Sequence, residues 1–319
     1  MEIPVMQHVL LPESATRNSN PVHSLPVPEL PDITVYREAL ETRVAGHVLN
    51  NVEVGSPFVL RSVDPPLSAF SGRTVTAIER LGKRIVIAVD GELFLVIHLM
   101  IAGRLAWVPT GKKGVSRGRL AAFAFDTGTL ILTEAGTKRR ASLTAVSGRA
   151  ALGAMDRGGL DVLNSTDGAM LHRLRSENHT LKRSLTDPRL FDGIGNAYSD
   201  EILHAAQLSP MQLTSKLTDA DALRLVAAIR ATLRTWTDHL RVEAKGAWPT
   251  RVTAFHPEMA VHGRFKLPCP VCGVPVQRIR YAENETNYCA RCQTGGRLLA
   301  DRAMSRLLKE DWPRSLDDQ

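Results

Sequence analysis

The stretch CPVCGVPVQRIRYAENETNYCARC, residues 269–292, contains every cysteine of the chain. Its two C-x-x-C pairs, Cys269 with Cys272 and Cys289 with Cys292, are separated by sixteen residues. Two such pairs can place four thiolates at the corners of a tetrahedron, which suits Zn²⁺, and the residues between them are enough for a β-hairpin. Disulfides or unliganded buried thiols are the alternative, and the lack of a secretion signal argues against them. Because protein ligands fill all four positions, the sequence predicts one structural zinc.

Basic residues outnumber acidic ones and are clustered. The 319 residues include 40 Lys and Arg against 33 Asp and Glu, which gives a net charge of +7 and a pI near 9.5. A content of 44% apolar and 23% charged residues is typical of a globular protein and not of a disordered or fibrous one. Solvated loops are the usual setting of basic runs, but with three acid-free groups in one chain a polyanionic partner explains them equally well. These groups are Arg104, Lys112, Lys113, Arg117 and Arg119; Lys138, Arg139 and Arg140; and Arg264, Lys266, Arg278 and Arg280.

The sequence shows no sign of membrane insertion or secretion. No stretch approaches the ~20 apolar residues that a membrane-spanning helix needs. The N-terminus has no basic segment followed by an apolar core. We therefore expect a cytoplasmic protein without membrane contact.

A helix followed by strands is predicted after residue 27. Residues 1–27 lack periodicity and are rich in Pro, Ser and Asn, so we expect them to be disordered or wrongly assigned to the chain. Apolar residues then recur at helical spacing over 33–44, with Pro31 and Asp32 at the helix start and Gly46 at its end.

Seven β-branched or aromatic runs predict a β-sandwich or barrel over residues 28–148. A hairpin turn is expected at Asp90-Gly91. The runs are 47–54, 58–63, 73–81, 84–89, 92–99, 119–125 and 129–133.

Residues 149–262 have the pattern of a helical domain. The clearest helix begins at Thr218, an N-cap with Asp221 three residues on, and continues with apolar residues at helical spacing. Those residues are Leu223, Val226, Ile229, Leu233 and Trp236. Residues 263–319 are expected to form the zinc finger and a helical C-terminal extension.

A second helix start is predicted within RLFDGIGNAYSDEILHAAQLSP, residues 189–210. Gly193 and Gly195 permit a tight turn, and Asn196 stands where the helix begins. Its backbone N–H groups would be free to bind an anion, although simple helix capping also explains the pattern.

Three of these stretches together resemble one family. The PELPD start at 28–32, the GIGNAYSDEIL turn and helix at 193–203, and the terminal cysteine pairs occur in this order in the formamidopyrimidine-DNA glycosylase and endonuclease VIII (Fpg/Nei) family of base-excision repair enzymes. The resemblance covers about residues 28–293. It implies an α+β multidomain fold: an N-terminal β-sandwich with a flanking helix, a helical helix-two-turn-helix domain and a C-terminal zinc finger hairpin. It also implies damaged double-stranded DNA as the partner, zinc as the only cofactor, and a monomer associated with the nucleoid.

The resemblance makes Pro28 the catalytic nucleophile, provided that it is the first residue of the active protein. An amide nitrogen cannot attack, because its lone pair is delocalised into the carbonyl. A free α-amino group with a pKa of about 7.7–8.0 is neutral in roughly 10–20% of molecules at pH 7. If Val27 is encoded by GTG, this codon can serve as the start codon and be read as methionine. Pro28 then becomes residue one once that methionine is removed. Proteolytic maturation, or a genuine extension on a protein without lyase activity, are the alternatives.

Two further catalytic roles carry over by position. Glu29 matches the acid that assists base loss and opening of the sugar ring. Lys83 matches a strand lysine that binds DNA and takes part in elimination. A carboxylate that stabilises the first helix and an ordinary surface lysine are the structural alternatives.

The expected DNA contacts lie in the sandwich domain and in the helical domain. Asn196 and Lys182 match residues that hold the phosphate backbone. Ile101 stands where the family inserts a methionine into the duplex. Arg119, Arg139 and Arg140 of the basic groups are expected to add charge.

Several positions depart from the family pattern. Asp32 replaces a glutamate, and Asn284 stands in the finger where an arginine is expected, which puts the second elimination step in doubt. EAGTKRRASL, residues 134–143, replaces the loop that fills the space left by the flipped base. The segment 241–255 lacks the part that caps oxidised guanine. Oxidised purines and oxidised pyrimidines thus both stay open as substrates.

The sequence as a whole predicts a bifunctional DNA glycosylase and AP lyase that removes oxidised bases through an N-terminal proline Schiff base. The alternative is a DNA protein that binds lesions or abasic sites without chemistry and keeps residues 1–27 as a genuine tail. A zinc-ribbon interaction module is a third possibility, but it leaves the PELPD start unexplained.

Overall fold

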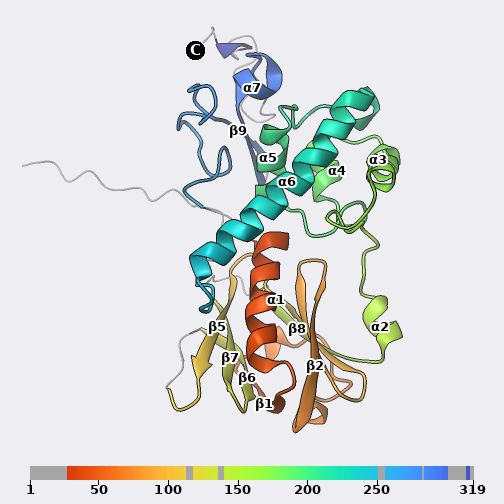
Figure 1. Ribbon diagram of the computed structural model, residues 1–319, viewed down its shortest axis with the longest axis vertical. Coiled ribbons are helices and arrows are strands. Elements are labelled where there is room, and N and C mark those ends of the chain that lie inside the picture. The colour runs from red at the N-terminus through yellow and green to blue at the C-terminus, as the bar shows by residue number, and fades with distance from the viewer. Residues whose placement is uncertain are drawn as a thin grey trace, which may run out of the picture.

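A computed structural model describes residues 27–112, 118–135, 140–250, 256–281, 284–300 and 314–316. A β-sandwich lies at one end of the molecule, and most of the helices and a small β-hairpin lie at the other (Figure 1). Two helices, α1 (Leu30–Val44) and α6 (Asp219–Ala244), run between these parts.

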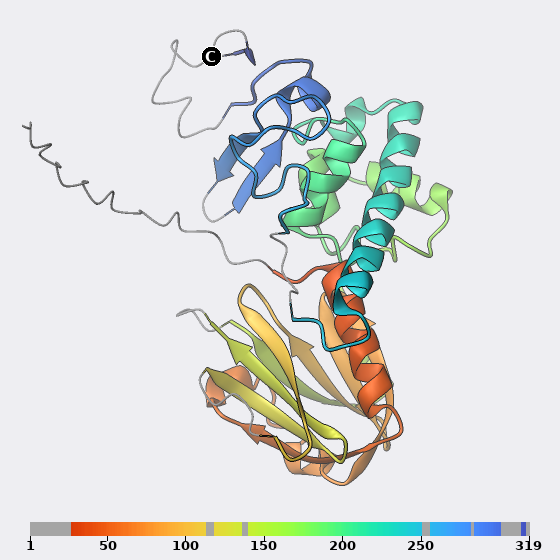
Figure 2. The same cartoon turned by 60° about the vertical axis from the view of Figure 1, so that its left-hand side comes forward.

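The sandwich is built from eight antiparallel strands in the order β5-β7-β6-β1-β2-β3-β4-β8. The β1–β2 pairing involves only two residue pairs, so the strands separate into two halves that face one another across a common core (Figure 2). The strands are β1 (Val48–Val54), β2 (Arg73–Leu81), β3 (Arg84–Val89), β4 (Leu93–His98), β5 (Gly103–Pro109), β6 (Arg119–Phe125), β7 (Gly128–Glu134) and β8 (Ser142–Ser147).

Side chains alternate between the two faces of a strand, and this explains how both faces of one half of the sandwich are buried. Ile85 and Ile87 of β3 point into the main core, while Val86 packs on the other face with Leu152 of α2 (Arg149–Gly153). The nearly continuous apolar run of β3 is therefore what a strand covered on both faces requires.

The structure corrects the strand prediction in three places. Residues 58–63 do not form a strand: a 3₁₀ turn, Pro57–Val59, begins there, and only Leu60 makes an isolated bridge, to Leu143. Proline at 57 cannot donate a ladder hydrogen bond, and Val63 is 90% exposed. Strands β5 and β8 were not among the predicted runs. The hairpin at Asp90-Gly91 between β3 and β4 is confirmed.

Helix α1 belongs to both halves of the molecule. Its start is confirmed: the backbone N–H of Glu29 donates to the Asp32 carboxylate over 2.8 Å. Leu30 lies in the helical core, whereas Ile33, Tyr36 and the following apolar residues lie in the sandwich core. The first turn of α1 thus stands where the two cores meet.

The helical region packs on α6, whose predicted cap is confirmed by a 3.1 Å hydrogen bond from the Asp221 N–H to the Thr218 hydroxyl. Val226, Ile229 and Leu233 of the predicted set are buried, but Leu223 is 48% exposed, because it lies at the edge of the stripe that they form with Ala222 and Leu225. The remaining helices are α3 (Asp167–Arg175), α4 (Leu181–Thr186) and α5 (Asn196–Ala205).

The finger consists of the hairpin β9 (Gln277–Tyr281) and β10 (Asn284–Tyr288), followed by α7 (Ala290–Thr294). Leu298 and Leu299 pack on Tyr288. The helical extension predicted after residue 293 is wrong for Leu298 and Leu299, which lie in non-helical chain beyond α7, and residues 301–313 lie outside the described residues.

Candidate functional site

The N-terminus of α5 is occupied by a carboxylate from α1. Both oxygens of Glu29 are used: they accept hydrogen bonds from the backbone N–H groups of Gly195 (2.5 Å), Ala197 (2.8 Å) and Tyr198 (3.3 Å). The N–H groups predicted to bind an anion are therefore not free, because Glu29 is that anion. Helix α5 begins at Asn196, as predicted, and Gly195 is its N-cap residue.

Gly195 provides the space in which Glu29 and Lys83 meet. A Cβ on this glycine would lie 2.5 Å from the carboxylate carbon of Glu29 and as close to Nζ of Lys83. Lys83 was expected within a strand, but it lies in the turn between β2 and β3. Burial lowers its pKa, although the charges of Glu29 and Asp192 act in the opposite direction.

Asp192 joins the β2–β3 turn to the helical region. It forms an ion pair with Arg80 of β2, and its Oδ1 would lie 3.3 Å from a Cβ on Gly82. The turn that carries Lys83 is thus held against the loop before α5.

Pro28 and Asp32 are buried on either side of Glu29 in the sequence. Asp32 is fully buried, and its Oδ1 has no hydrogen-bond partner in the described part of the chain. Desolvation raises the pKa of Asp32 to about 7, although the Glu29 N–H and the charge of Arg104 lower it. Asp32 is thus a group that gains or loses a proton near neutral pH within this site.

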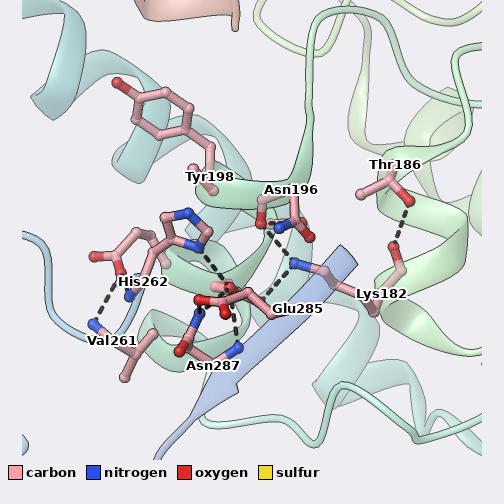
Figure 3. A network of polar contacts seen from close by, with 12 residues as sticks. Lys182, Thr186, Asn196, Tyr198, Val261, His262, Glu285 and Asn287 are labelled. Carbon is pink, nitrogen blue, oxygen red and sulfur yellow. Dashed lines mark hydrogen bonds and ion pairs between the residues drawn. The ribbon is translucent and has the colours of Figure 1, made fainter. Parts of the chain in front are cut away.

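A second polar cluster centres on Asp200 of α5, which is 1% exposed. Its Oδ1 accepts a 2.5 Å hydrogen bond from Nζ of Lys182, and its Oδ2 lies 2.8 Å from Nδ1 of His262 and accepts the backbone N–H of Asn287 over 3.1 Å (Figure 3). Burial raises the pKa of Asp200, but the charge of Lys182 and the hydrogen bond with His262 outweigh it and leave the pKa below its usual value. The cluster connects α4, α5, β10 and the segment before the finger.

Lys182 links this cluster to the first one. Its Nζ also donates to the backbone carbonyl of Asn196 over 2.6 Å, one residue from the glycine that Glu29 contacts. The structure therefore brings together Glu29, Lys83, Asn196 and Lys182, which the sequence singled out separately.

Glu201, next to Asp200, holds the segment that precedes the finger. Its carboxylate accepts the backbone N–H groups of Ala260 (2.7 Å), Val261 (2.9 Å) and His262 (2.9 Å). Asp200 and Glu201 were not predicted as site residues, although both stand in the SDEIL segment. Acidic residues so close to a helix start were the available signal. Apart from Lys182, however, their partners lie about 60 or more positions further along the chain.

The four cysteines are reduced and face one another. Sγ of Cys269 lies 3.9 Å from Sγ of Cys292, and Sγ of Cys272 lies 3.3 Å from Sγ of Cys289. With zinc–sulfur bonds of about 2.3 Å, sulfur atoms of a tetrahedral site lie about 3.8 Å apart. Nε2 of His204 lies 3.3 Å from Sγ of Cys269 and can support a thiolate there. The set fits Zn²⁺.

The other predicted DNA contacts lie elsewhere. Ile101 is half-buried in the turn between β4 and β5. Arg119 of β6 pairs with Glu53 over 2.7 Å, and the backbone N–H of Arg140 donates to Glu134. Arg139 lies outside the described residues.

The third basic group is not isolated from acids in space. Glu285 of β10 lies 3.5 Å from Arg278 and 3.9 Å from Arg280, and Arg278 also stacks over the ring of Phe265. The β-hairpin brings this acid beside the two arginines. No helix in the described ranges is long and apolar enough to cross a lipid bilayer.

Sequence models of three domain families match this chain in order. They describe the formamidopyrimidine-DNA glycosylase N-terminal domain (residues 27–141), the formamidopyrimidine-DNA glycosylase H2TH domain (161–242) and the zinc finger found in FPG and IleRS (266–295). Together with the sulfur geometry, the third match shows that the four cysteines are the ligands of one structural zinc.

Relatives and solved structures agree with these matches. A formamidopyrimidine-DNA glycosylase of Heliobacterium modesticaldum is 30% identical over 84% of this chain and 100% of its own length. An uncharacterized formamidopyrimidine-DNA glycosylase-like protein of Mycobacterium tuberculosis is 39% identical over 47% of this chain and 94% of its own length. The Lactococcus lactis Fpg in complex with a DNA that contains FAPY-dG has the same fold, with a TM-score of 0.73 and 22% identity over 83% of this chain and 100% of that one. The chain therefore belongs to the formamidopyrimidine-DNA glycosylase family.

Proposed function

We propose that this protein is a base-excision repair DNA glycosylase with AP lyase activity, which acts on damaged duplex DNA through the secondary amine of Pro28. One observation carries the proposal. The residue after Pro28, Glu29, is buried, receives three backbone hydrogen bonds at the start of α5, and lies beside Lys83. Family membership supplies the class of substrate, since the related proteins are named as formamidopyrimidine-DNA glycosylases.

The chemistry requires a free amine at Pro28. Attack of this nitrogen on the sugar C1′ forms a carbon–nitrogen bond while the bond to the damaged base breaks. Opening of the sugar ring then gives an iminium ion that is cationic without further protonation, and this ion accepts the electron pair when the strand is cleaved by elimination. The proposal therefore concerns the form of the protein that begins at Pro28.

Glu29 and Lys83 are proposed to handle protons around this step. Three N–H donors and the N-terminus of α5 stabilise the Glu29 carboxylate where it stands, so its position does not depend on the substrate. The lowered pKa of Lys83 brings its proton exchange closer to neutral pH, which suits a group that takes part in elimination.

Lys182 and Asn196 are proposed to hold the phosphate backbone of the flipped nucleotide. A lysine ammonium has three N–H donors, and two of those of Lys182 are directed at Asp200 and at the Asn196 carbonyl. The third N–H group of Lys182 is available to a phosphate oxygen, and the two existing hydrogen bonds fix its direction. Ile101 is proposed to enter the gap in the base stack, and Arg119, Arg139 and Arg140 to add charge along the duplex.

Borohydride trapping on duplex DNA with an abasic site tests the proposal, because reduction of the iminium leaves a stable covalent complex. The protein begun at Met-Pro28 is compared with the full 319 residues and with Pro28→Gly in the short form. Glycine keeps a primary amine, so this variant should trap more weakly than proline.

Strong trapping by the short form, with little by the full chain, is the expected result. If neither form traps while both bind the DNA, the protein recognises lesions without chemistry, and the enzymatic proposal fails.

A further inference from the structure

A cluster of two histidines and a glutamate lies at the end of α6, outside the sites described above. His239 and Glu243 are four residues apart and so share one face of the helix. His256 comes from the segment after α6 and is 7% exposed. Their three ligand-type atoms lie within 4.8 Å of one another.

The distances within the cluster scatter around those of a metal site. Nε2 of His239 lies 3.3 Å from Nε2 of His256, which lies 3.0 Å from Oε1 of Glu243; the remaining edge, from Nε2 of His239 to the same oxygen, is 3.8 Å. With metal–ligand bonds of about 2.0–2.2 Å, the ligand atoms of a tetrahedral site lie about 3.3–3.6 Å apart. The sulfur–sulfur distances of the four cysteines, 3.9 and 3.3 Å, scatter to a similar extent around the separation expected for the longer zinc–sulfur bonds.

The surroundings also suit a cation. Oε2 of Glu258 lies 3.6 Å from Nδ1 of His239, so a second carboxylate faces the nitrogen that points away from the cluster. The ring of Trp236 packs against both imidazoles, with centroids 5.3 and 5.2 Å away, and shields one side. Glu243 also lines a cavity of about 420 Å³ beside Trp248.

A network of hydrogen bonds alone satisfies these groups poorly. The backbone N–H of Glu258 donates to Nδ1 of His256 over 3.3 Å, so a neutral His256 carries its proton on Nε2. This single proton faces both Glu243 and His239 and can serve only one of them well. A metal ion would engage all three lone pairs, at the cost of the long hydrogen bond from Glu258.

We propose that His239, Glu243 and His256 form a second metal site, which binds Zn²⁺ or a divalent transition ion of similar ligand preference. Two imidazoles and one carboxylate are a ligand set that Zn²⁺ takes, with a fourth position left for water or another ligand. The ion would tie the segment before the finger to the last turns of α6. This site is independent of the proposed repair chemistry.

The test measures metal content and Co²⁺ binding of the full chain with its finger zinc in place. Mass spectrometry of the zinc-saturated protein should find a second equivalent of zinc beyond that of the four cysteines. Co²⁺ in the second site should give visible absorption without the thiolate charge-transfer bands of a cysteine site. Co²⁺ in this site should also quench the fluorescence of Trp236. The variant Trp236→Phe identifies the contribution of this residue among those of the four tryptophans.

Glu243→Gln keeps the shape of a half-buried side chain. It should lower the affinity for the second equivalent of zinc by at least about tenfold, as should His239→Gln. His256→Ala removes a buried ring, so its folding is checked by circular dichroism, and Glu243→Gln does not share that risk. His172→Ala, an exposed histidine of α3, is the matched control and should change nothing. The proposal is overturned if the wild type binds only the finger zinc, or if the second equivalent is unaffected by the Glu243 and His239 variants.

Discussion

The carboxylate of Glu29 accepts a 2.5 Å hydrogen bond from the backbone N–H of Gly195, a residue 166 positions further along the chain. Leu30 repeats the connection, since its N–H donates to the carbonyl of Gly193 over 3.0 Å. The start of α1 therefore has its final position only when the sandwich and the helical region are docked. Any chemistry at Pro28 depends on this junction.

Gly195→Ala should disrupt the junction directly. The added methyl group meets the Glu29 carboxylate and Lys83 Nζ, so one of them must move. We expect a loss of about 1–3 kcal/mol of unfolding free energy and a strong loss of trapping in the Met-Pro28 form. Gly168→Ala in α3, where nothing lies within 4 Å of the new methyl group, is the control and should be neutral or slightly stabilising in denaturant titration. Equal behaviour of the two variants would contradict the crowded geometry.

Glu29→Gln tests the three hydrogen bonds at α5. The amide NH₂ of glutamine would face at least one N–H donor, which leaves that donor unsatisfied. The free energy of unfolding should fall by about 1–3 kcal/mol, and base release should slow by about 10²-fold or more. Glu41→Gln on the exposed part of α1 is the matched control. Base excision at a wild-type rate would remove Glu29 from the proposed mechanism.

Asp32 should make stability fall as the pH rises. Its pKa of about 7 in the folded protein exceeds the ordinary value of 3.8, so between these pH values the unfolded chain loses a proton that the folded protein keeps. The penalty grows through this window, reaches roughly 4 kcal/mol, and is constant above it. Subtracting the profile of Asp32→Asn isolates the effect in denaturant titrations from pH 4 to 8.

Asp90→Asn provides the opposite control for that measurement. The Thr74 N–H and Arg73 lower the pKa of Asp90, so its contribution to stability is present above the ordinary pKa and disappears as the pH falls. The stability difference between wild type and each variant is followed against pH. If this difference changed as steeply with pH for Asp90→Asn as for Asp32→Asn, Asp32 would not be the cause of the fall.

Asp200 and Lys182 should behave as a coupled pair. Asp200→Asn leaves the largely buried ammonium of Lys182 without its counter-charge, which should cost about 3–5 kcal/mol. The double variant Asp200→Asn, Lys182→Met removes both charges and should recover part of this loss, which a double-mutant cycle measures. Additive effects would mean that the ion pair does not hold α4 against α5.

Removal of the structural zinc should weaken DNA binding more than it affects the sandwich. Chelation should unfold the finger, because its small core consists mainly of the cysteines and their apolar neighbours. We expect at least a tenfold loss of affinity for abasic-site duplex, as a rough lower limit, and recovery on adding Zn²⁺. Unchanged affinity after full zinc release, followed with a colorimetric chelator, would exclude a role of the finger in binding.

Local patterns predicted the elements that depend on local interactions. The caps at Asp32 and Thr218, the hairpin at Asp90-Gly91 and the cysteine spacing need only neighbours in the chain, and each is present in the structure. The predicted strand at 58–63 failed because a 3₁₀ turn begins at Pro57, which cannot donate a ladder hydrogen bond. Leu223 is exposed although Val226, Ile229 and Leu233 of the same predicted set are buried, because it lies at the edge of the stripe that they form.

By itself, the sequence determined the family pattern, the order of sandwich, helices and finger, and the zinc ligands, because these follow from residue type and spacing. Only the tertiary structure decided what the charged groups contact. Glu29 at the start of α5, Asp200 between Lys182 and Asn287, and the cluster of His239, Glu243 and His256 all pair residues across loops or domains. The energy of a buried charge depends on its partners and on its access to water, and both are set by how distant segments pack.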